Sequence, residues 1–390
     1  MASAWKADRI GSATTTIFAE MSALALATQS INLGQGFPDT DGPAFMLEEA
    51  RAAIAGGINQ YPPGRGILPL RQAIAAHSSR TYGLNYDPES EVVITTGATE
   101  ALAASMLAFV NPGDEVIALE PFFDSYAASI EVAGGQRVGV SLFGPNFRLD
   151  HAELAAAFTP KTKAMLINSP HNPTGVVLDR ADLATIAELA VQHDVLVICD
   201  EVYEHLTFDD AEHLPLATFP GMRERTVRIS SAGKTFWATG WKIGWALATP
   251  ELIYEITAVK QYLSYSSGAP FQPAIARALN EGDEWVEKAR LDLQDRRDQF
   301  AEGLRSIGLE PILPRGTYFM TTDVRPLGYA DGMEFCRDLP TRCGVVAIPH
   351  QVLYDRVEAG KPYVRWAFCK QERVLDEAIR RLQALRNQAD

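Results

Sequence analysis

Residues 164–203, AMLINSPHNPTGVVLDRADLATIAELAVQHDVLVICDEVY, decide the fold class of this chain of 390 residues. The stretch begins with an apolar run at 164–168, places apolar residues three and four apart over 180–192, and ends in a second apolar run at 195–199. This order is typical of two parallel strands joined by a helix. Polar residues follow each run directly, so we expect them at the sheet edge where α/β folds bind ligands.

The same alternation extends over the middle of the chain. Further β-branched runs, each ending in small or polar residues, lie at 92–96, 115–119, 137–142, 226–230 and 243–248. Helical patterns separate most of these runs, for example at 99–110. The alternation predicts an α/β fold, with a mostly parallel sheet that helices cover on both faces.

The sequence changes in character after about residue 280. Residues 283–307 form a long, charge-rich helical run, which we expect to lead into a smaller α+β unit. That unit would end in a helix over 372–387. Residues 12–26 show the only regular pattern in the first 40 residues, and we expect them to pack against the smaller unit.

Composition excludes several classes of protein. The chain has 35 Lys and Arg against 49 Asp and Glu, and this net charge of −14 counts against nucleic-acid binding. Residues 1–10 contain no apolar core, and no apolar stretch approaches the roughly 20 residues of a membrane span, so we expect neither a secretory signal nor a membrane segment. The four cysteines form no CxxC pair and have no histidine at metal-ligand spacing, which predicts reduced thiols in the cytoplasm and no metal site.

Small and polar residues at the ends of the runs are the candidates for chemistry. Gly97, Ala98 and Thr99 open a helix after the run at 92–96, and the free N–H groups of such a turn can bind an anion. Asp200 ends an apolar strand, where a carboxylate is costly unless it meets a cation or a protonated nitrogen. A plain helix cap is the alternative for this aspartate.

Two further segments carry a lysine and an asparagine in unusual settings. Lys234 lies in SAGKTF at 231–236, among small residues at a strand end, with a second amine at Lys242. A lysine in such a place can be held partly neutral, as Schiff-base chemistry requires. Asn172 lies between two prolines in SPHNPTG at 169–175, and the prolines fix the backbone that holds its amide at the sheet edge.

Together these segments resemble the pyridoxal-phosphate-dependent aminotransferases of fold type I, class I/II. The resemblance covers nearly the whole chain, from NLGQGFP at 32–38 to YVRW at 363–366, and is most specific around Lys234 and Asn172. Within the family, the sequence is similar to the branch of kynurenine/glutamine aminotransferases and actinobacterial N-succinyldiaminopimelate aminotransferases. The resemblance implies the fold of type I transferases, with a mostly parallel seven-stranded sheet and a smaller α+β domain.

The resemblance also implies how the chain is organised. We expect an N-terminal arm with part of the small domain at 1–45, a large pyridoxal-phosphate-binding domain at 46–281, and a C-terminal small domain at 282–390. A two-fold homodimer with shared active sites would follow, because Tyr61 lies on a stiff loop that in the family reaches the neighbouring subunit's cofactor.

Residue by residue, the resemblance assigns the cofactor site. Lys234 would be the catalytic lysine that holds pyridoxal 5'-phosphate as a Schiff base. Asp200 would pair with the ring nitrogen, Tyr203 and Asn172 would bind the ring O3′, and Phe123 would stack on the ring. The phosphate ligands implied are the turn of Gly97, Ala98 and Thr99, together with Ser231, Lys242 and Tyr61 of the neighbouring subunit.

The substrate α-carboxylate would be held by Arg365, with Asn172 and the backbone near Gly36. Lys242 stands where many class I members have arginine, and the kynurenine-type branch also uses lysine there. The reaction implied is transfer of an amino group between an amino acid and a 2-oxo acid.

The substrate itself is indicated by the residues before Pro270-Phe271-Gln272. Kynurenine-type relatives place aromatic residues there, whereas this chain has SSGA at 266–269. Small residues and hydroxyls, with Arg65 as a further cation, favour a long diacid such as N-succinyldiaminopimelate, with 2-oxoglutarate or glutamate as the second substrate. The same residues could instead form a tight turn, with Arg65 in solvent. A kynurenine/glutamine-type aminotransferase and a carbon–sulfur β-lyase stay open, because the β-lyase begins with the same removal of the α-proton.

Overall fold

The computed structural model describes residues 5, 7 and 16–388. Among these residues, seven strands form the main sheet in the order β2-β8-β7-β6-β5-β3-β4. Their bounds are β2 (Val92–Thr96), β3 (Glu115–Glu120), β4 (Gln136–Ser141), β5 (Thr162–Asn168), β6 (Leu196–Asp200), β7 (Thr226–Ser231) and β8 (Ile243–Leu247). Only β8 runs antiparallel to its neighbours in this sheet, so the expectation of a mostly parallel sheet is confirmed.

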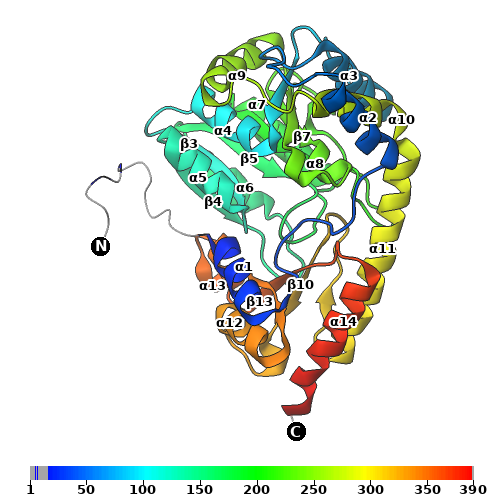
Figure 1. Cartoon of the computed structure of the whole chain (residues 1–390). Coiled ribbons are helices and arrows are strands. Elements are labelled where there is room, and N and C mark those ends of the chain that lie inside the picture. Colours follow the sequence, from blue (N-terminus) through cyan, green and yellow to red (C-terminus); the bar gives the residue numbers. More distant parts are fainter. Residues whose placement is uncertain (1–4, 6, 8–15, 389–390) are drawn as a thin grey trace.

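Helices cover both faces of this sheet (Figure 1). They are α2 (Ala44–Ala55), α3 (Leu68–Tyr82), α4 (Gly97–Phe109), α5 (Asp124–Ala133), α6 (His151–Ala157), α7 (Arg180–Gln192), α8 (Ala232–Thr235), α9 (Pro250–Leu263) and α10 (Phe271–Glu281). Successive strand residues alternate between the two faces. Ile117 of β3 packs in one core with Leu183 of α7, and its neighbour Val116 packs in another with Leu102 of α4.

A smaller group of elements lies below the main sheet in Figure 1. It holds a four-stranded sheet in the order β12-β13-β10-β9 and a two-stranded sheet of β1 and β11. The strands are β1 (Ile31–Asn32), β9 (Pro311–Ile312), β10 (Phe319–Asp323), β11 (Val345–Val346), β12 (Ile348–Pro349) and β13 (Tyr363–Ala367). Its helices are α1 (Ile17–Thr28), α11 (Asp283–Ser306), α12 (Gly332–Cys343), α13 (Val357–Gly360) and α14 (Glu372–Leu382).

The N-terminal segment packs with the C-terminal part of the chain, as the sequence predicts. Ile31 of β1 pairs in parallel with Val345 of β11, and Met21 of α1 shares a core with Phe335 of α12 and Trp366 of β13. Segments more than 300 residues apart in sequence therefore build one core beneath the main sheet (Figure 1).

The predicted helix ends differ from the structure at both termini. Helix α1 begins at Ile17, because the side chain of Thr16 accepts a hydrogen bond from the backbone N–H of Ala19. Residues 12–15 of the pattern expected at 12–26 lie outside the described residues. Most of the segment 1–10 lies outside them as well. The helix expected over 372–387 ends as an α-helix at Leu382 and continues in tighter 3-10 turns over Gln383–Gln388, which are common at helix ends.

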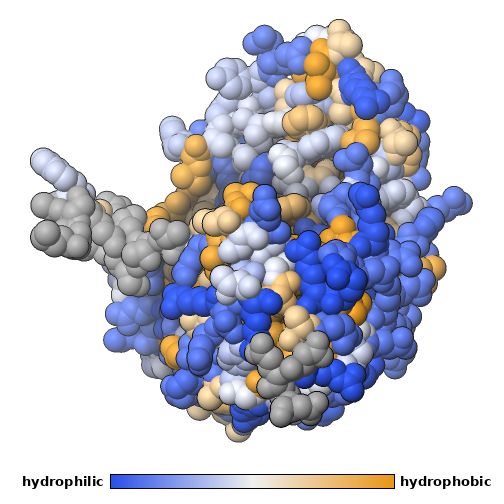
Figure 2. Space-filling model, turned by 60° about the horizontal axis from the view of Figure 1, so that its bottom comes forward, coloured by the Kyte–Doolittle hydropathy of each residue, from blue (hydrophilic) through white to orange (hydrophobic). Residues whose placement is uncertain are grey.

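The surface is mostly hydrophilic where Figure 2 shows it, and the cysteines are not paired. Figure 2 shows a face on which hydrophilic residues predominate and apolar residues form small, scattered patches. None of the described helices is long and apolar enough to cross a membrane. All four cysteines are free thiols, as expected, and Cys199, Cys336 and Cys369 are buried.

Candidate active site

A cavity of about 400 Å³ opens at the carboxyl ends of the central strands. It is lined from above by the segments after β2, β5, β6 and β7, and from below by Phe319 of β10 and Arg365 of β13. All predicted site residues except Tyr61 line it, namely Gly36, Gly97, Ala98, Thr99, Phe123, Asn172, Asp200, Tyr203, Ser231, Lys234, Lys242 and Arg365. The fold therefore brings together residues that span most of the sequence.

Lys234 lies on the short helix α8, directly after β7. Its Nζ donates hydrogen bonds to the hydroxyl oxygen of Tyr318 at 2.9 Å and to the carbonyl oxygen of Gly36 at 3.3 Å. Burial disfavours the ammonium form and lowers the pKa of Lys234 to about 8. The amine can therefore exist partly neutral near neutral pH, which the sequence pattern predicts.

Asp200 is the last residue of β6 and is buried. Its Oδ2 accepts a hydrogen bond of 2.7 Å from the hydroxyl of Tyr126, and its Oδ1 accepts one from the backbone N–H of Val202. Burial nevertheless raises the pKa of Asp200 to about 6, because the hydrogen bond from Tyr126 offsets only part of the desolvation. A carboxylate held this way suits a protonated ring nitrogen, which would supply the missing positive charge.

The neighbouring strand fixes the position of Asn172. Asn168 pairs with Asp200 across β5 and β6, and its Nδ2 donates to the Asp200 backbone carbonyl at 2.8 Å. Its Oδ1 in turn accepts a hydrogen bond of 2.7 Å from the backbone N–H of Asn172. Asn172 is thus tied to the same sheet edge as Asp200, and it lines the cavity next to Arg365, whose Nη1 donates to its Oδ1.

Arg365 is a fully buried guanidinium on β13. Its Nη1 donates to Asn172 Oδ1 at 2.8 Å and its Nη2 to the carbonyl oxygen of Gly34 at 2.6 Å. Phe319 lies against the guanidinium at 4.0 Å from its ring centroid. Burial lowers the pKa of Arg365 to about 10, which leaves it charged at neutral pH.

One donor of this guanidinium has no partner. Arg365 Nε is buried and makes no hydrogen bond within the described part of the chain. Buried donors are rarely left unpaired in proteins. The guanidinium is held in place by Asn172 and Gly34 and keeps bonding capacity for a carboxylate, which it can bind through parallel N–H groups.

A turn that admits only glycine forms a cradle at the start of α4. Gly97 has a φ of +73°, and a Cβ there would lie 2.9 Å from Lys242 Nζ. A Cβ on Gly244 of β8 would lie 2.4 Å from the carbonyl carbon of Gly97. The N–H groups of Ala98 and Thr99 open this helix, so helix N-terminus and ammonium face one cavity, and the residues present fit a phosphate.

Sequence reasoning missed the two tyrosines that orient these groups. Tyr318 receives the hydrogen bond of Lys234 and donates its own proton to the Gly36 carbonyl at 2.7 Å. Tyr126 donates to Asp200. Both come from elements remote in sequence from their partners, and no spacing or motif marks them.

Tyr61 and Arg65 lie outside this cavity. Tyr61 is 81% exposed and packs edge-on against the ring of Tyr265. The Arg65 guanidinium donates to the backbone carbonyls of Glu89 and Ser90, at 2.7 Å and 2.9 Å, and to that of Val92. These hydrogen bonds hold the Arg65 guanidinium against its own chain, and its role as a cation for a distal substrate carboxylate stays a prediction.

Fold and site define a fold type I transferase, and comparison with known proteins gives the family. The profile described as aminotransferase class I and II matches residues 28–382, and the chain belongs to that family. It is a pyridoxal-phosphate-dependent aminotransferase.

Individual relatives are similar over almost their whole length. A probable N-succinyldiaminopimelate aminotransferase of Mycobacterium tuberculosis is 55% identical over 381 residues, covering 95% of this chain and 96% of the relative. The solved structure of N-succinyldiaminopimelate aminotransferase from that organism aligns with a TM-score of 0.96 over 97% of this chain and 100% of its own. The methionine aminotransferase of Escherichia coli is 41% identical, with coverage of 95% and 96%.

Proposed function

We propose that this aminotransferase interconverts N-succinyldiaminopimelate and 2-oxoglutarate with the corresponding 2-oxo acid and glutamate. The observation that carries the choice of substrate is the 55% identity to the mycobacterial relative, against 41% to the methionine aminotransferase. Both substrates are α-amino or α-oxo acids, so the buried guanidinium of Arg365 serves each of them in turn.

In this proposal Lys234 is the residue that moves the proton. When bound, pyridoxal phosphate supplies an aldehyde and a protonated ring that withdraws electrons from the substrate Cα. Lys234 Nζ takes the proton from that Cα, because its lowered pKa provides a neutral amine near pH 8. Tyr318 and the Gly36 carbonyl orient the amine through their hydrogen bonds.

The other residues of the cavity hold the cofactor and fix the orientation of its ring. Asp200 holds the ring nitrogen, with its carboxylate oriented by Tyr126. Asn172 and Tyr203 serve the ring O3′, and Phe123 covers a ring face. The phosphate ligands proposed are the backbone of Gly97, Ala98 and Thr99, and the side chains of Ser231 and Lys242, all of which line the cavity.

Arg365 and Asn172 bind the α-carboxylate of the substrate. The Asn172 amide oxygen already accepts from Arg365 Nη1, which leaves its NH₂ group to donate. Charged hydrogen bonds in a water-poor cavity orient the Cα–H bond toward Lys234, and this orientation accelerates the proton transfer.

Small side chains next to α10 support a long substrate. Thr96 Oγ1 lies 3.0 Å from Ser267 Oγ and 3.2 Å from Ser264 Oγ, so these hydroxyls form one polar cluster. Ser266 Oγ is buried and makes no hydrogen bond among the described residues, and none of these serines lines the cavity around Lys234. We propose that this hydroxyl is available to a distal polar group of the substrate. A flat aromatic substrate such as kynurenine would gain nothing from these hydroxyls.

A comparison of catalytic efficiencies tests the substrate. We expect kcat/KM with 2-oxoglutarate to be highest for N-succinyldiaminopimelate, ahead of kynurenine, glutamine and methionine. A clear preference for any of the other three would contradict the proposal. Cystathionine supplied alone distinguishes the β-lyase alternative, because pyruvate release without an oxo acid would show that reaction.

The second part of the proposal concerns assembly. We propose a two-fold homodimer in which Tyr61 serves the cofactor of the partner subunit. Tyr265 contacts the Tyr61 ring, and the nearby residues Tyr262 and Leu263 in the same segment of the chain as Tyr265 are 86% and 51% exposed. Lys260 donates to the carbonyls of Gly64 and Tyr265, which ties the Tyr61 loop to this aromatic face.

We also propose the domain division at 1–45, 46–281 and 282–390 and a cytoplasmic location. The core that α1 shares with the C-terminal elements supports the division, and residues 202–208 of the large domain pack against it. Free, buried thiols support a reducing compartment.

A further inference from the structure

A second cavity, of about 540 Å³, lies behind the segment that follows β6. Its lining comes from α3, from residues 204–213 and from the start of α11, and it is rich in charged and imidazole side chains. Among the described residues, none lines both this cavity and the cofactor cavity. The side chains of this second cavity therefore have no role in the proposed aminotransferase reaction.

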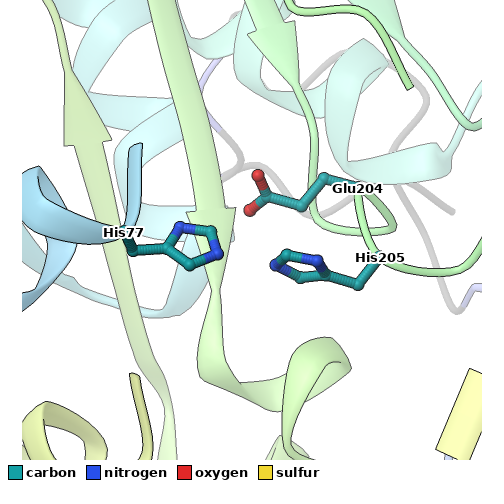
Figure 3. Close-up of side chains that lie close together, drawn as sticks. All are labelled: His77, Glu204 and His205. Atoms are coloured by element: carbon teal, nitrogen blue, oxygen red, sulfur yellow. The ribbon is translucent and has the colours of Figure 1, made fainter. Parts of the chain in front are cut away.

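Three of the side chains converge at this cavity (Figure 3). His77 comes from α3, whereas Glu204 and His205 follow β6. One nitrogen or carboxylate oxygen of each lies within 4.8 Å of those of the other two. The two imidazole rings are 4.9 Å apart between centroids, and Figure 3 shows the rings and the carboxylate turned toward one another.

The two imidazoles are available as ligands. His77 is only 7% exposed, and in the described part of the chain no hydrogen bond is made by its ring nitrogens or by those of His205. A neutral imidazole offers one nitrogen lone pair without a proton, which can bind a metal ion.

The carboxylate of Glu204 supplies a negative charge whose ion pair with Arg228 is long. Ser230 Oγ donates to its Oε1 at 2.5 Å, but the nearest guanidinium nitrogen, on Arg228, is 3.7 Å from Oε2. Arg228 instead forms its short contacts, both at 2.7 Å, with Glu201. Two imidazoles and one carboxylate form the ligand set of many zinc sites.

A neighbouring cluster of ligating side chains is a poorer candidate for a metal site, because an arginine already contacts one of its carboxylates. Glu201, Glu204 and His213 also lie within ligating distance of one another. The Arg228 guanidinium contacts Glu201 there and lies close to Glu204, so a cation is already present. A metal ion would have to displace a buried arginine, which makes this position unfavourable.

We propose that His77, Glu204 and His205 bind a divalent transition-metal ion, with Zn²⁺ as the best match. Bonds of about 2.0–2.2 Å place tetrahedral zinc ligands about 3.4 Å apart, so the three atoms, which lie within 4.8 Å of one another, need to close by about 1.4 Å at most. The fourth position faces the cavity, where water completes the coordination. Because Glu204 follows Tyr203 directly, the ion would rigidify the segment that carries the cofactor residues. The sequence predicts no metal site, because its cysteines form no CxxC pair and have no histidine at metal-ligand spacing.

Zinc binding to the intact holoenzyme, prepared without a histidine tag and freed of metal by a chelator, tests the site. We expect about one Zn²⁺ per chain by elemental analysis after gel filtration, and a rise in melting temperature on adding Zn²⁺. Cobalt(II) as a probe would show the visible absorption of four-coordinate Co²⁺. We expect His77→Gln and His205→Ala to weaken zinc binding at least about 100-fold, since even partners of a ligand contribute 10–100-fold.

His151→Ala is the matched control, because His151 lies at the surface beside Asp182, far from this cluster. It should bind zinc as the unchanged protein does. Each variant is checked for the cofactor absorption band and for its circular dichroism, so that misfolding is recognised. Zinc at less than about one ion per chain, or equal affinity in all three variants and the parent, would overturn the proposal.

Discussion

Lys234 Nζ lies 2.9 Å from the hydroxyl oxygen of Tyr318, and that hydroxyl donates its own proton to the carbonyl of Gly36. The lysine comes from the edge of the large sheet, and Tyr318 directly precedes β10 of the small one. The base of the proposed reaction is therefore positioned by both halves of the structure. A movement of one sheet against the other would change the direction of the amine.

The raised pKa of Asp200 predicts an effect on the stability of the protein without cofactor. Its folded pKa is about 6, above the value near 3.9 of an unfolded aspartate. The folded form thus holds the proton more tightly, and this contribution to stability is present below pH 4 and lost as the pH rises through 6. At pH 7.5 the buried charge costs up to about 3 kcal/mol.

We therefore expect Asp200→Asn to raise the melting temperature of the cofactor-free protein at pH 7.5 and to change it little at pH 4.5. Thermal denaturation at both pH values measures this difference. A uniform loss of stability at both would contradict the buried-charge account. The same variant should lower kcat at least about 100-fold, because the ring nitrogen loses its partner.

Gly97 and Gly113 form a matched pair for testing the phosphate cradle. Both have a positive φ, +73° and +92°, but only at Gly97 would a Cβ meet Lys242, whereas nothing lies within 4 Å at Gly113. We expect Gly97→Ala to weaken pyridoxal phosphate at least about tenfold in a fluorescence titration. Gly113→Ala carries the same backbone strain and should leave the affinity unchanged; equal losses in both would assign the effect to strain alone.

Arg365→Lys removes the paired N–H donors of the guanidinium but keeps a positive charge. Lysine cannot bind Asn172, Gly34 and a carboxylate at once, so we expect amino-acid and oxo-acid binding to weaken by about 2–3 kcal/mol. Spectral titration with each substrate measures this loss. The spectrum of the bound cofactor should not change, and loss of the cofactor would show that Arg365 is needed for structure instead.

Sedimentation velocity tests the proposed homodimer. We expect a single species at twice the chain mass of 42.6 kDa, with activity falling as dilution dissociates it. Tyr61→Phe should dimerise normally and bind the cofactor more weakly, because the hydroxyl serves the partner's phosphate. A fully active monomer would contradict this part of the account.

The sequence predicts the fold well where its signals are local. Apolar strand runs with polar residues at their ends place Asp200, Asn172 and Lys234 at one edge of a parallel sheet, and all three line one cavity. Nothing local marks Tyr126 or Tyr318, because their partners come from other elements.

Arg65 also has partners that its sequence neighbourhood does not indicate. In the fold its guanidinium donates to the backbone carbonyls of Glu89, Ser90 and Val92. The convergence of His77 with Glu204 was equally invisible, since it depends on how α3 packs beside the end of β6. Hydrogen-bond partners brought together by packing are what a single sequence lacks.

The turnover rate of Lys234→Ala tests the central claim most directly. Reconstituted with pyridoxal phosphate, the variant should keep its fold and lose at least about a thousandfold in kcat, since it lacks the base at Cα. An added small primary amine should restore part of this rate, and Lys288→Ala, at an exposed lysine, should behave as the parent. A Lys234→Ala enzyme with near-normal turnover would contradict the account.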